Sequence, residues 1–291
     1  VAAGSVEKRL SPIIILLLAG ALVTVVALWA VDRAGRVGGS AAGAVTPGSG
    51  QSGETFHWKL VTTWPKNFPG LGIGPENFAR YVQEMSAGRL TVRVYGAGEI
   101  VPPFEVFDAV SQGVADAGHG AAYYWKGKIP SSVFFTTVPF GLTAQEINAW
   151  LHHGGGLALW REASAPAGII PFAGGNSGVQ MAGWFNREIQ SVEDLKGLKR
   201  RIPGLAGEVF NAAGGTAVRI PGSELYTSLQ TGVIDATEWV GPYNDLALGL
   251  HEVAGYYYDP GWHEPGSMLE LLVNRDAFQA LPPDLQAIVT H

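Results

Sequence analysis

Apolar and polar positions predict strands and helices that alternate along the chain from residue 56 onward. Runs that alternate or are rich in β-branched residues predict strands, and runs with apolar residues every three or four positions predict helices. The predicted strands cover residues 56–64, 90–95, 168–172, 179–186, 198–202, 233–238 and 267–274. The predicted helices cover residues 75–85, 104–112, 144–150, 205–213 and the segment from Asp284 onward. Thr143 and Glu146 predict a capping box for the helix at 144–150, and residues 256–258 with 261–266 are expected to form an aromatic loop. Strands that alternate with helices form mostly parallel sheets, so the sequence predicts an α/β fold.

One stretch, residues 227–245, brings polar and aromatic side chains to the end of a predicted strand. Gly232 stands at a helix C-terminus, where a residue free to adopt positive φ is favoured, and a β-branched pair then begins the strand. Glu238 and Trp239 follow, and a Gly-Pro pair stops the strand. Ligands of open α/β sheets bind beyond the carboxyl ends of the strands. Glu238 and Trp239 stand at such a strand end.

A similar phrase occurs earlier in the chain. Residues 112–117 read QGVADA and residues 231–236 read TGVIDA, and each copy follows a predicted helix. The first copy leads into an aromatic cluster at residues 123–125, and the second leads into Glu238 and Trp239. The similarity of the two phrases could be a coincidence, because Gly-hydrophobic-x-Asp is a common sequence where a helix joins a strand. The repetition favours two α/β lobes whose strand ends face each other.

Composition and charge narrow the function classes. The 291 residues are 47% hydrophobic and 15% charged, and the formal net charge is −6. A net negative charge argues against a nucleic-acid-binding function, because binding nucleic acid requires a basic surface. The chain has no cysteine, so disulfides and thiolate metal sites are excluded.

The N-terminal segment contains a long run of apolar residues. The run 13–31 lacks charged residues, follows Lys8 and Arg9, and approaches the roughly 20 residues that span a bilayer. We interpret residues 1–36 as a signal anchor or an uncleaved signal peptide, with the rest of the chain outside the cytoplasm; a buried soluble helix is the alternative. Residues 37–54 are rich in Gly, Ala, Ser and Thr and read as a flexible linker.

A few polar residues near strand ends are candidates for ligand contacts. Arg201 ends a strand and offers the planar fork of donors that suits a carboxylate, whereas Arg200 fits a surface position better. Gln180 offers an amide oxygen, and Glu238 and Glu264 lie in loops rich in Gly, Pro and Trp. Judged from the residues alone, each glutamate fits an ordinary loop position better than a ligand contact.

Aromatic residues gather near the same loops, and enzyme signatures are missing. Trp64, Trp125, Trp239 and Trp262 are too numerous there to belong only to a core. Aromatic walls with a few polar groups are typical of a small-molecule site. The sequence has no G-x-S-x-G, HExxH or phosphate-loop motif.

A family resemblance rests on long blocks that recur in order. The blocks are HWKLVTTWP, YGAGEIVPPFEVFDAVSQG, GHGAAYYWKGK, PFGLTAQEINAW, HHGGG, GGNSGVQMAGWFN, LKGLKRRIPG, LQTGVIDATEWVGPYND and YYYDPGWHEPG. They closely resemble the extracytoplasmic solute-binding proteins of TRAP transporters, the DctP-like family. Within it they are most similar to the branch that binds 2-oxo acids and 2-hydroxy acids. The resemblance covers about residues 56–291.

The resemblance implies a type II periplasmic-binding-protein fold, with two α/β lobes, a hinge and a ligand cleft between the lobes. Lobe I is expected at residues 55–178 and lobe II at residues 179–266. Residues 267–291 are expected to return to lobe I. The chain should cross between the lobes near residues 174–179 and return near residues 265–268.

The resemblance also implies roles for single residues. Arg201 should clamp the ligand carboxylate, and a cation, Na⁺ or Ca²⁺, should bridge protein and ligand. The substrate-binding residues that it implies are Gln180, Arg201, Tyr124 and Trp239. The cation ligands that it implies are Glu238, the Trp239 backbone carbonyl, Glu264 and Gln180. On charge alone Ca²⁺ is slightly favoured, because it neutralises the site fully.

The implied function is non-catalytic: capture of a small monocarboxylate, such as pyruvate or lactate, and delivery to the TRAP membrane permease. Two alternatives stay open, a metal-dependent hydrolase or lyase using both glutamates, and a membrane-tethered chemoreceptor ectodomain. Family members usually continue beyond the last residue of this chain with a long C-terminal helix. We therefore expect a fragment whose missing helix supports the lobes or makes a homodimer.

Overall fold

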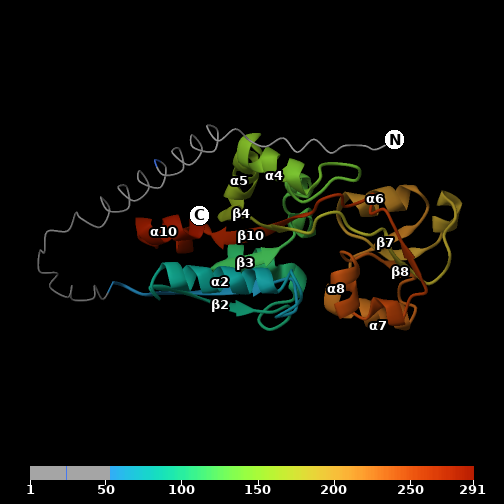
Figure 1. Ribbon diagram of the computed structural model, residues 1–291, viewed down its shortest axis with the longest axis horizontal. Helices are drawn as coiled ribbons and strands as arrows, with labels where there is room; N and C mark the ends of the chain where they lie inside the picture. Colours follow the sequence, from blue (N-terminus) through green and yellow to red (C-terminus); the bar gives the residue numbers. More distant parts are fainter. Residues whose placement is uncertain (1–23, 25–52) are drawn as a thin grey trace, which may run out of the picture. The chain divides into compact units, whose positions relative to one another are not determined.

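The strands of the folded part form two separate five-stranded sheets (Figure 1). The computed structural model describes residues 53–291 together with Thr24, and residues 54–291 form one compact unit. Apart from Thr24, the predicted membrane segment 1–36 lies outside the described residues, as does nearly all of the predicted linker 37–54. Among the residues that are described, no helix combines the length and the apolar content needed to cross a membrane.

The first sheet has the order β2-β1-β3-β10-β4, and we call the part of the chain built on it lobe I. Its strands are β1 (Phe56–Thr62), β2 (Leu90–Tyr95), β3 (Ala117–Gly120), β4 (Ile169–Asn176) and β10 (Met268–Asn274). Its α-helices are α2 (Ile73–Met85), α3 (Val106–Ser111), α4 (Ala144–His153), α5 (Gly156–Ser164), α9 (Arg275–Gln279) and α10 (Pro283–Thr290). Its 3₁₀ turns are η1 (Pro103–Glu105), η2 (Ala122–Trp125), η3 (Pro130–Phe135) and η4 (Ala165–Ala167). Strand β1 pairs in parallel with β2 and β3, whereas β10 lies antiparallel between β3 and β4.

The second sheet has the order β7-β6-β8-β5-β9, and the part built on it is lobe II. Its strands are β5 (Gly183–Phe185), β6 (Lys199–Arg201), β7 (Thr216–Val218), β8 (Ala236–Thr237) and β9 (Tyr256–Tyr258). Its α-helices are α6 (Gly204–Ala212), α7 (Leu225–Gln230) and α8 (Pro242–Ala247). Its 3₁₀ turns are η5 (Val192–Leu195), η6 (Gly222–Glu224) and η7 (Leu250–Glu252). Strand β6 pairs in parallel with β7 and β8, and β5 pairs antiparallel with β8 and β9.

Several predicted elements occur as expected, and the shortest strands differ. The strand at 90–95 is β2, and the helix after Thr143 begins with a capping box between Thr143 and Glu146. The strand expected at 179–186 shrinks to β5, because residues 180–182 instead hydrogen-bond to backbone carbonyls of three other segments. The strand expected from residue 233 is only β8.

The expected aromatic loop at residues 256–258 is strand β9 at the edge of the second sheet. The paired strand β5 explains this difference, since backbone pairing with it orders the tyrosines. The repeated phrase, by contrast, marks equivalent positions. Its first copy leads into β3 of the first sheet and its second into β8 of the second sheet, and each glycine of the phrase has positive φ: 73° at Gly113 and 71° at Gly232.

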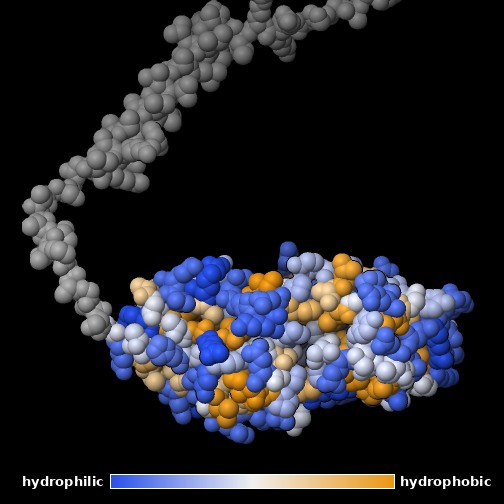
Figure 2. Space-filling view, turned by 90° about the horizontal axis from the view of Figure 1, so that it is seen from below, coloured by the Kyte–Doolittle hydropathy of each residue, from blue (hydrophilic) through white to orange (hydrophobic). Residues whose placement is uncertain are grey.

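Two segments connect the lobes, and we call them the crossing segments. Residues 177–182 link β4 to β5, and residues 259–267 link β9 back to β10. Apolar side chains from both lobes meet in one buried cluster, which includes Trp64 and Phe68 of lobe I and Trp239 of lobe II. On the face that Figure 2 shows, apolar residues are interspersed with polar ones. The lobes therefore touch through an apolar core near the ends of their strands.

Candidate ligand and cation site

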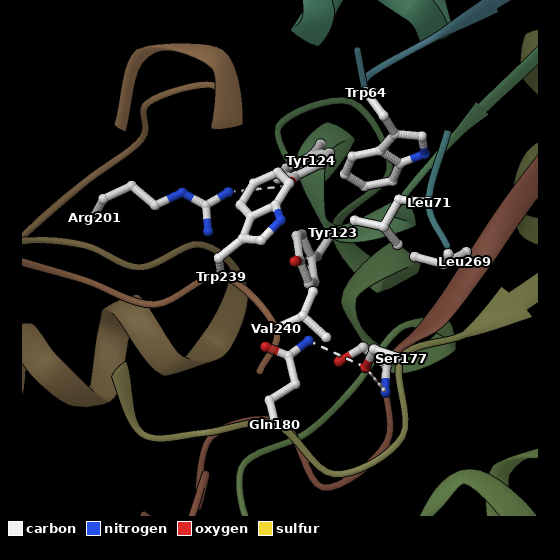
Figure 3. A pocket seen from close by; sticks show the side chains of 11 residues that line it. Trp64, Leu71, Tyr123, Tyr124, Ser177, Gln180, Arg201, Trp239, Val240 and Leu269 are labelled. Carbon is white, nitrogen blue, oxygen red and sulfur yellow. Dashed lines mark hydrogen bonds between the residues drawn. The ribbon is translucent and has the colours of Figure 1, made fainter. Parts of the chain in front are cut away.

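A small cavity lies between the lobes, with walls from both of them (Figure 3). Its free volume is about 20 Å³, room for about one water molecule. It is lined by Trp64, Leu71, Tyr123, Tyr124, Ser177, Gln180, Arg201, Trp239, Val240, Ser267 and Leu269. The structure thus brings the four predicted substrate-binding residues to one place. Aromatic and apolar walls with a few polar groups suit a small organic ligand.

Arg201 is the positive group of this cavity. It ends strand β6, and only 1% of its surface is exposed. Its Nε donates to the Ile220 carbonyl at 3.1 Å, its Nη2 donates to the Tyr124 hydroxyl at 3.0 Å, and its Nη1 donates to the Glu238 carboxylate. Burial by itself lowers the pKa of Arg201, but the neighbouring Glu238 outweighs burial and raises it. Arg201 therefore keeps its charge in the interior.

The neighbouring Arg200 is buried, so the expectation of a surface position was wrong. Only 2% of it is exposed, and its guanidinium lies 5.0 and 5.5 Å from the ring centroids of Phe185 and Phe210. The side chain alternates to the other face of β6, where the core of lobe II covers it. Burial lowers the pKa of Arg200 to about 10, so the group stays charged at neutral pH and acts on Glu238 and Glu264.

Aromatic groups from both lobes close around Arg201. The guanidinium carbon of Arg201 lies 5.2 Å from the ring centroid of Trp239, a cation–π contact. Trp239 in turn meets Trp64 edge to face at a centroid distance of 5.9 Å. Tyr124 accepts the hydrogen bond from Arg201 across the lobe boundary. Lobe II thus supplies the guanidinium and one wall, and lobe I supplies the opposite wall.

The predicted cation ligands provide buried oxygens that lack partners. Glu238 Oε2, Glu264 Oε1 and Gln180 Oε1 have no hydrogen-bond partner within the described part of the chain. The amide nitrogen of Gln180 donates to Glu264 Oε2 at 2.7 Å, which leaves the amide oxygen free. Unpartnered buried oxygens are costly, and hard cations such as Na⁺ or Ca²⁺ take oxygen ligands of this kind. The donor set therefore fits such a cation.

His263 belongs to the same group, and the sequence reasoning missed it. One ligand atom from each of Glu238, His263 and Glu264 lies within 4.8 Å of the other two. His263 is fully buried, its Nε2 lies 3.8 Å from Glu238 Oε2, and within residues 53–291 neither ring nitrogen has a hydrogen-bond partner. Burial lowers its pKa, so the ring stays neutral and its lone pair is available. The one signal in the sequence was its position directly before Glu264.

The two glutamates differ in their ease of ionisation. Burial raises the pKa of Glu238, but the guanidinium of Arg201 outweighs that effect and holds the pKa below its usual range. Glu264 makes no ion pair within residues 53–291, and burial together with the negative Glu238 outweighs the weaker effect of Arg201 and raises its pKa to about 8. Two carboxylates this close repel each other, and a cation between them relieves the repulsion.

Only two of the four tryptophans expected at a pocket line the cavity, Trp64 and Trp239. Trp125 is buried in the core of lobe I and donates its Nε1 hydrogen to Glu270 at 2.8 Å. Trp262 stacks on Phe140 at a centroid distance of 5.8 Å. Aromatic residues near a glycine-rich loop therefore serve packing as often as the site in this chain.

Comparison with known proteins identifies the protein family of this chain. Residues 60–291 match the family of bacterial extracellular solute-binding proteins, family 7. The chain belongs to this family. Membership confirms the predicted class, an extracellular solute-binding protein, and with it the predicted location outside the cytoplasm.

This family 7 protein has close relatives of known character. Over 231 residues it is 49% identical to a monocarboxylate 2-oxoacid-binding periplasmic protein of Nostoc sp.. The aligned region covers 79% of this chain and 63% of the Nostoc protein. Two solved TRAP periplasmic solute-binding proteins are each 51% identical with a TM-score of 0.79, covering 81% of this chain and 72% of theirs. The protein of Pseudoalteromonas atlantica holds sodium and pyruvate, and that of Colwellia psychrerythraea holds calcium and pyruvate. The likeness confirms the predicted two-lobed α/β fold.

A buried carboxyl group in lobe I of this solute-binding protein makes its stability depend on pH. Only 1% of Glu270 is exposed, and burial raises its pKa to about 8 from an ordinary 4.5. Between these values the folded state binds more protons than the unfolded state, so stability falls as pH rises, by up to about 1.4 kcal/mol per pH unit.

We expect Glu270→Gln to remove this share of the pH dependence, because an amide does not titrate between these pH values. The amide oxygen can still accept the hydrogen bond from Trp125, so the fold should be kept. Urea unfolding at pH 5 and pH 8, with wild type and variant side by side, measures the free energy of unfolding. An equal loss in both proteins between the two pH values would contradict the prediction.

Proposed function

We propose that this protein is the solute-binding component of a TRAP transporter, capturing a small 2-oxo acid such as pyruvate or a 2-hydroxy acid such as lactate. The observation that carries the proposal is the buried, charged Arg201 at a cavity with aromatic walls, next to a group of unpartnered oxygens. A planar guanidinium matches a carboxylate with two parallel hydrogen bonds. Pyruvate held with sodium or calcium in two relatives of 51% identity supports the same pairing.

The small cavity also limits the ligand. A free volume of about 20 Å³, room for about one water molecule, is smaller than a carboxylate with its neighbouring carbon. A ligand of pyruvate size must spread the walls, which come from different lobes. Tyr124 and Trp239 would then close on its short chain, and Arg201 would bind its carboxylate. The geometry thus supports a monocarboxylate with at most a short chain.

The cation would bind next to the carboxylate. Glu238, Glu264 and Gln180 would supply side-chain oxygens, and Trp239 would supply its backbone carbonyl. Neutral His263 lies within reach of the same point, so the donor set is not restricted to oxygen, as the sequence had suggested. When bound, the cation offsets the repulsion of the carboxylates and draws the ligand's oxygens toward the protein.

Charge balance changes once Arg200 is counted. Two glutamates and the ligand carboxylate bring three negative charges, and Arg201 offsets one of them. If Arg201 alone is counted, a divalent ion neutralises the site. Buried Arg200 acts on both glutamates and offsets a second charge. Charge alone then gives Na⁺ complete neutrality, and the slight preference for Ca²⁺ that the sequence suggested no longer follows.

We also propose the expected lobe borders, with lobe I at residues 55–178 and 267–291 and lobe II at residues 179–266. Strand β4 ends at Asn176 and β5 begins at Gly183, whereas β9 ends at Tyr258 and β10 begins at Met268. Both borders therefore fall within the crossing segments. This supports a hinge made of these two segments.

The partner that the family implies is a TRAP membrane permease, which would accept the solute from the closed lobes. The chain spans 63% of the length of the Nostoc relative. The homodimer through a C-terminal helix and the membrane anchor at residues 1–36 remain predictions. A chemoreceptor ectodomain would share the binding step and differ in its partner.

The test is titration calorimetry of residues 53–291 with pyruvate and lactate, each in Na⁺, in Ca²⁺ and after chelation. Acetate, which lacks the 2-oxygen, is the control ligand. We expect saturable binding of pyruvate or lactate, tighter with a cation, and no measurable binding of acetate. Equal affinity for acetate would contradict recognition of a 2-oxo or 2-hydroxy acid.

A further inference from the structure

The two crossing segments are joined by hydrogen bonds between a pair of serines, which we call the hinge serines, Ser177 and Ser267. The Ser177 amide donates to the Ser267 carbonyl at 3.0 Å, and the Ser267 amide donates to the Ser177 hydroxyl at 3.3 Å. A further backbone bond of 3.1 Å runs from Gln180 to Glu264. The segment that enters lobe II and the one that leaves it thus behave as one linked unit.

Each hinge serine also holds one of the proposed cation ligands. The Ser267 hydroxyl donates to Oε2 of Glu264, and the Gln180 amide donates to the same oxygen. Both hydrogen bonds fall on Oε2, so Oε1 is the oxygen left for another partner. The Gln180 amide nitrogen also donates to the Ser177 hydroxyl at 3.1 Å (Figure 3), so both amide hydrogens are used and the amide oxygen is left free.

We propose that the hinge serines are positioning residues: from the lobe I side of the two borders they orient Gln180 and Glu264, two cation ligands of lobe II, so that a bound cation stabilises the hinge in this closed conformation. The inference rests on the proposed cation site. Gln180 and Glu264 come from different crossing segments, and a cation bound to both ties these segments together. Glu238, at the end of β8, ties the same cation to lobe II.

The direction of the two hydrogen bonds explains why serine suits these positions. Only 1% of Glu264 is exposed, and a buried carboxylate is costly unless polar groups hydrogen-bond to it. A hydroxyl donor and an amide donor on one oxygen favour the ionised carboxylate and fix its rotation. Groups that orient metal ligands in this way typically change metal affinity by about 10–100-fold when they are removed.

The test compares Ser267→Ala, Ser177→Ala and Ser132→Ala with wild type. Ser132 is the matched control: 2% of it is exposed, and within the described residues its hydroxyl lacks a hydrogen-bond partner. Calorimetry measures Ca²⁺ affinity without carboxylate and pyruvate affinity after chelation. Small-angle scattering measures the compaction that Ca²⁺ alone produces. Thermal melting monitors the folded state.

We expect each hinge-serine variant to bind Ca²⁺ about 10-fold or more weakly, and to need proportionally more Ca²⁺ for compaction. Both serines also line the cavity, so pyruvate affinity in chelator is the reference. We expect Ca²⁺ affinity to fall by a larger factor than pyruvate affinity in chelator, because Arg201 is untouched, whereas general loosening of the fold would weaken both by the same factor. Wild-type Ca²⁺ affinity in both variants, or an equal loss in Ser132→Ala, overturns the proposal and leaves the proposed function standing. Absence of Ca²⁺ and Na⁺ binding in wild type itself overturns the cation site and the hinge role together.

Discussion

Replacing Arg201 by Ala is expected to abolish pyruvate binding. The side chain is 1% exposed and lies at the cavity, where a carboxylate would accept two charged hydrogen bonds. Each such bond contributes about 1.5–3 kcal/mol, so the loss is on the order of 100-fold or more. Arg201→Lys keeps the charge but loses the planar fork, and we expect it to weaken binding about 10-fold or more. Titration calorimetry measures both.

The control for this prediction must separate binding from folding. Arg201→Ala leaves Glu238 buried and unpaired, which by itself costs about 3–5 kcal/mol of stability. The double variant Arg201→Met, Glu238→Gln removes both charges and should melt closer to wild type while still failing to bind. Arg219→Lys is the arginine control: Arg219 is exposed, and its guanidinium carbon lies 3.9 Å from the Phe104 ring centroid, outside the cavity. Wild-type affinity in Arg201→Lys would refute the carboxylate clamp.

Glu238→Gln is expected to weaken pyruvate binding and to remove its dependence on a cation. In wild type, cation and pyruvate should each raise the affinity for the other by the same factor, typically about 5–150-fold. The sign is informative because Glu238 also pairs with Arg201. If Glu238 acted only as a competing or repelling charge, neutralising it would free the guanidinium and tighten binding. Only a cation bridge predicts weaker binding.

The experiment measures pyruvate affinity with Na⁺, with Ca²⁺ and after chelation, in wild type and in Glu238→Gln. Glu270→Gln is the matched control, since Glu270 is equally buried but lies at Trp125 in lobe I. It should bind pyruvate and cation like wild type. Tighter pyruvate binding by Glu238→Gln, or a wild-type pyruvate affinity that chelation does not change, would contradict the cation bridge.

Local patterns predicted those parts of the fold that local physics decides. The strand at 90–95, the capping box at Thr143 and the positive φ of Gly232 each depend on a few adjacent residues. Strand β5 and strand β9 depend instead on pairing with distant segments, so residues 179–186 looked like a longer strand and residues 256–258 like a loop. Strand length in lobe II is set by these long-range partners.

The site shows the same division. Arg201 and Glu238 were candidates because each stands at a strand end, where ligands of open α/β sheets bind, and the family resemblance supplied their roles. The environment of Arg200 was missed because alternation gives only the face on which a side chain lies, and both faces of β6 are covered. His263 was missed because its burial and its position beside Glu238 depend on how the second crossing segment folds over lobe II.

The position of β10 sets the order in which the lobes can be completed. All five strands of lobe II lie in one uninterrupted stretch, residues 183–258, so its sheet can form while the rest of the chain is still being made or exported. Strand β10 comes later in the chain but sits between β3 and β4. Until residues 268–274 arrive, β3 and β4 expose unpaired edges in the middle of the sheet, which makes the first lobe to be synthesised the last to close. Unpaired strand edges of this kind pair with other chains and cause aggregation. A chaperone would therefore be needed most before β10 has been inserted.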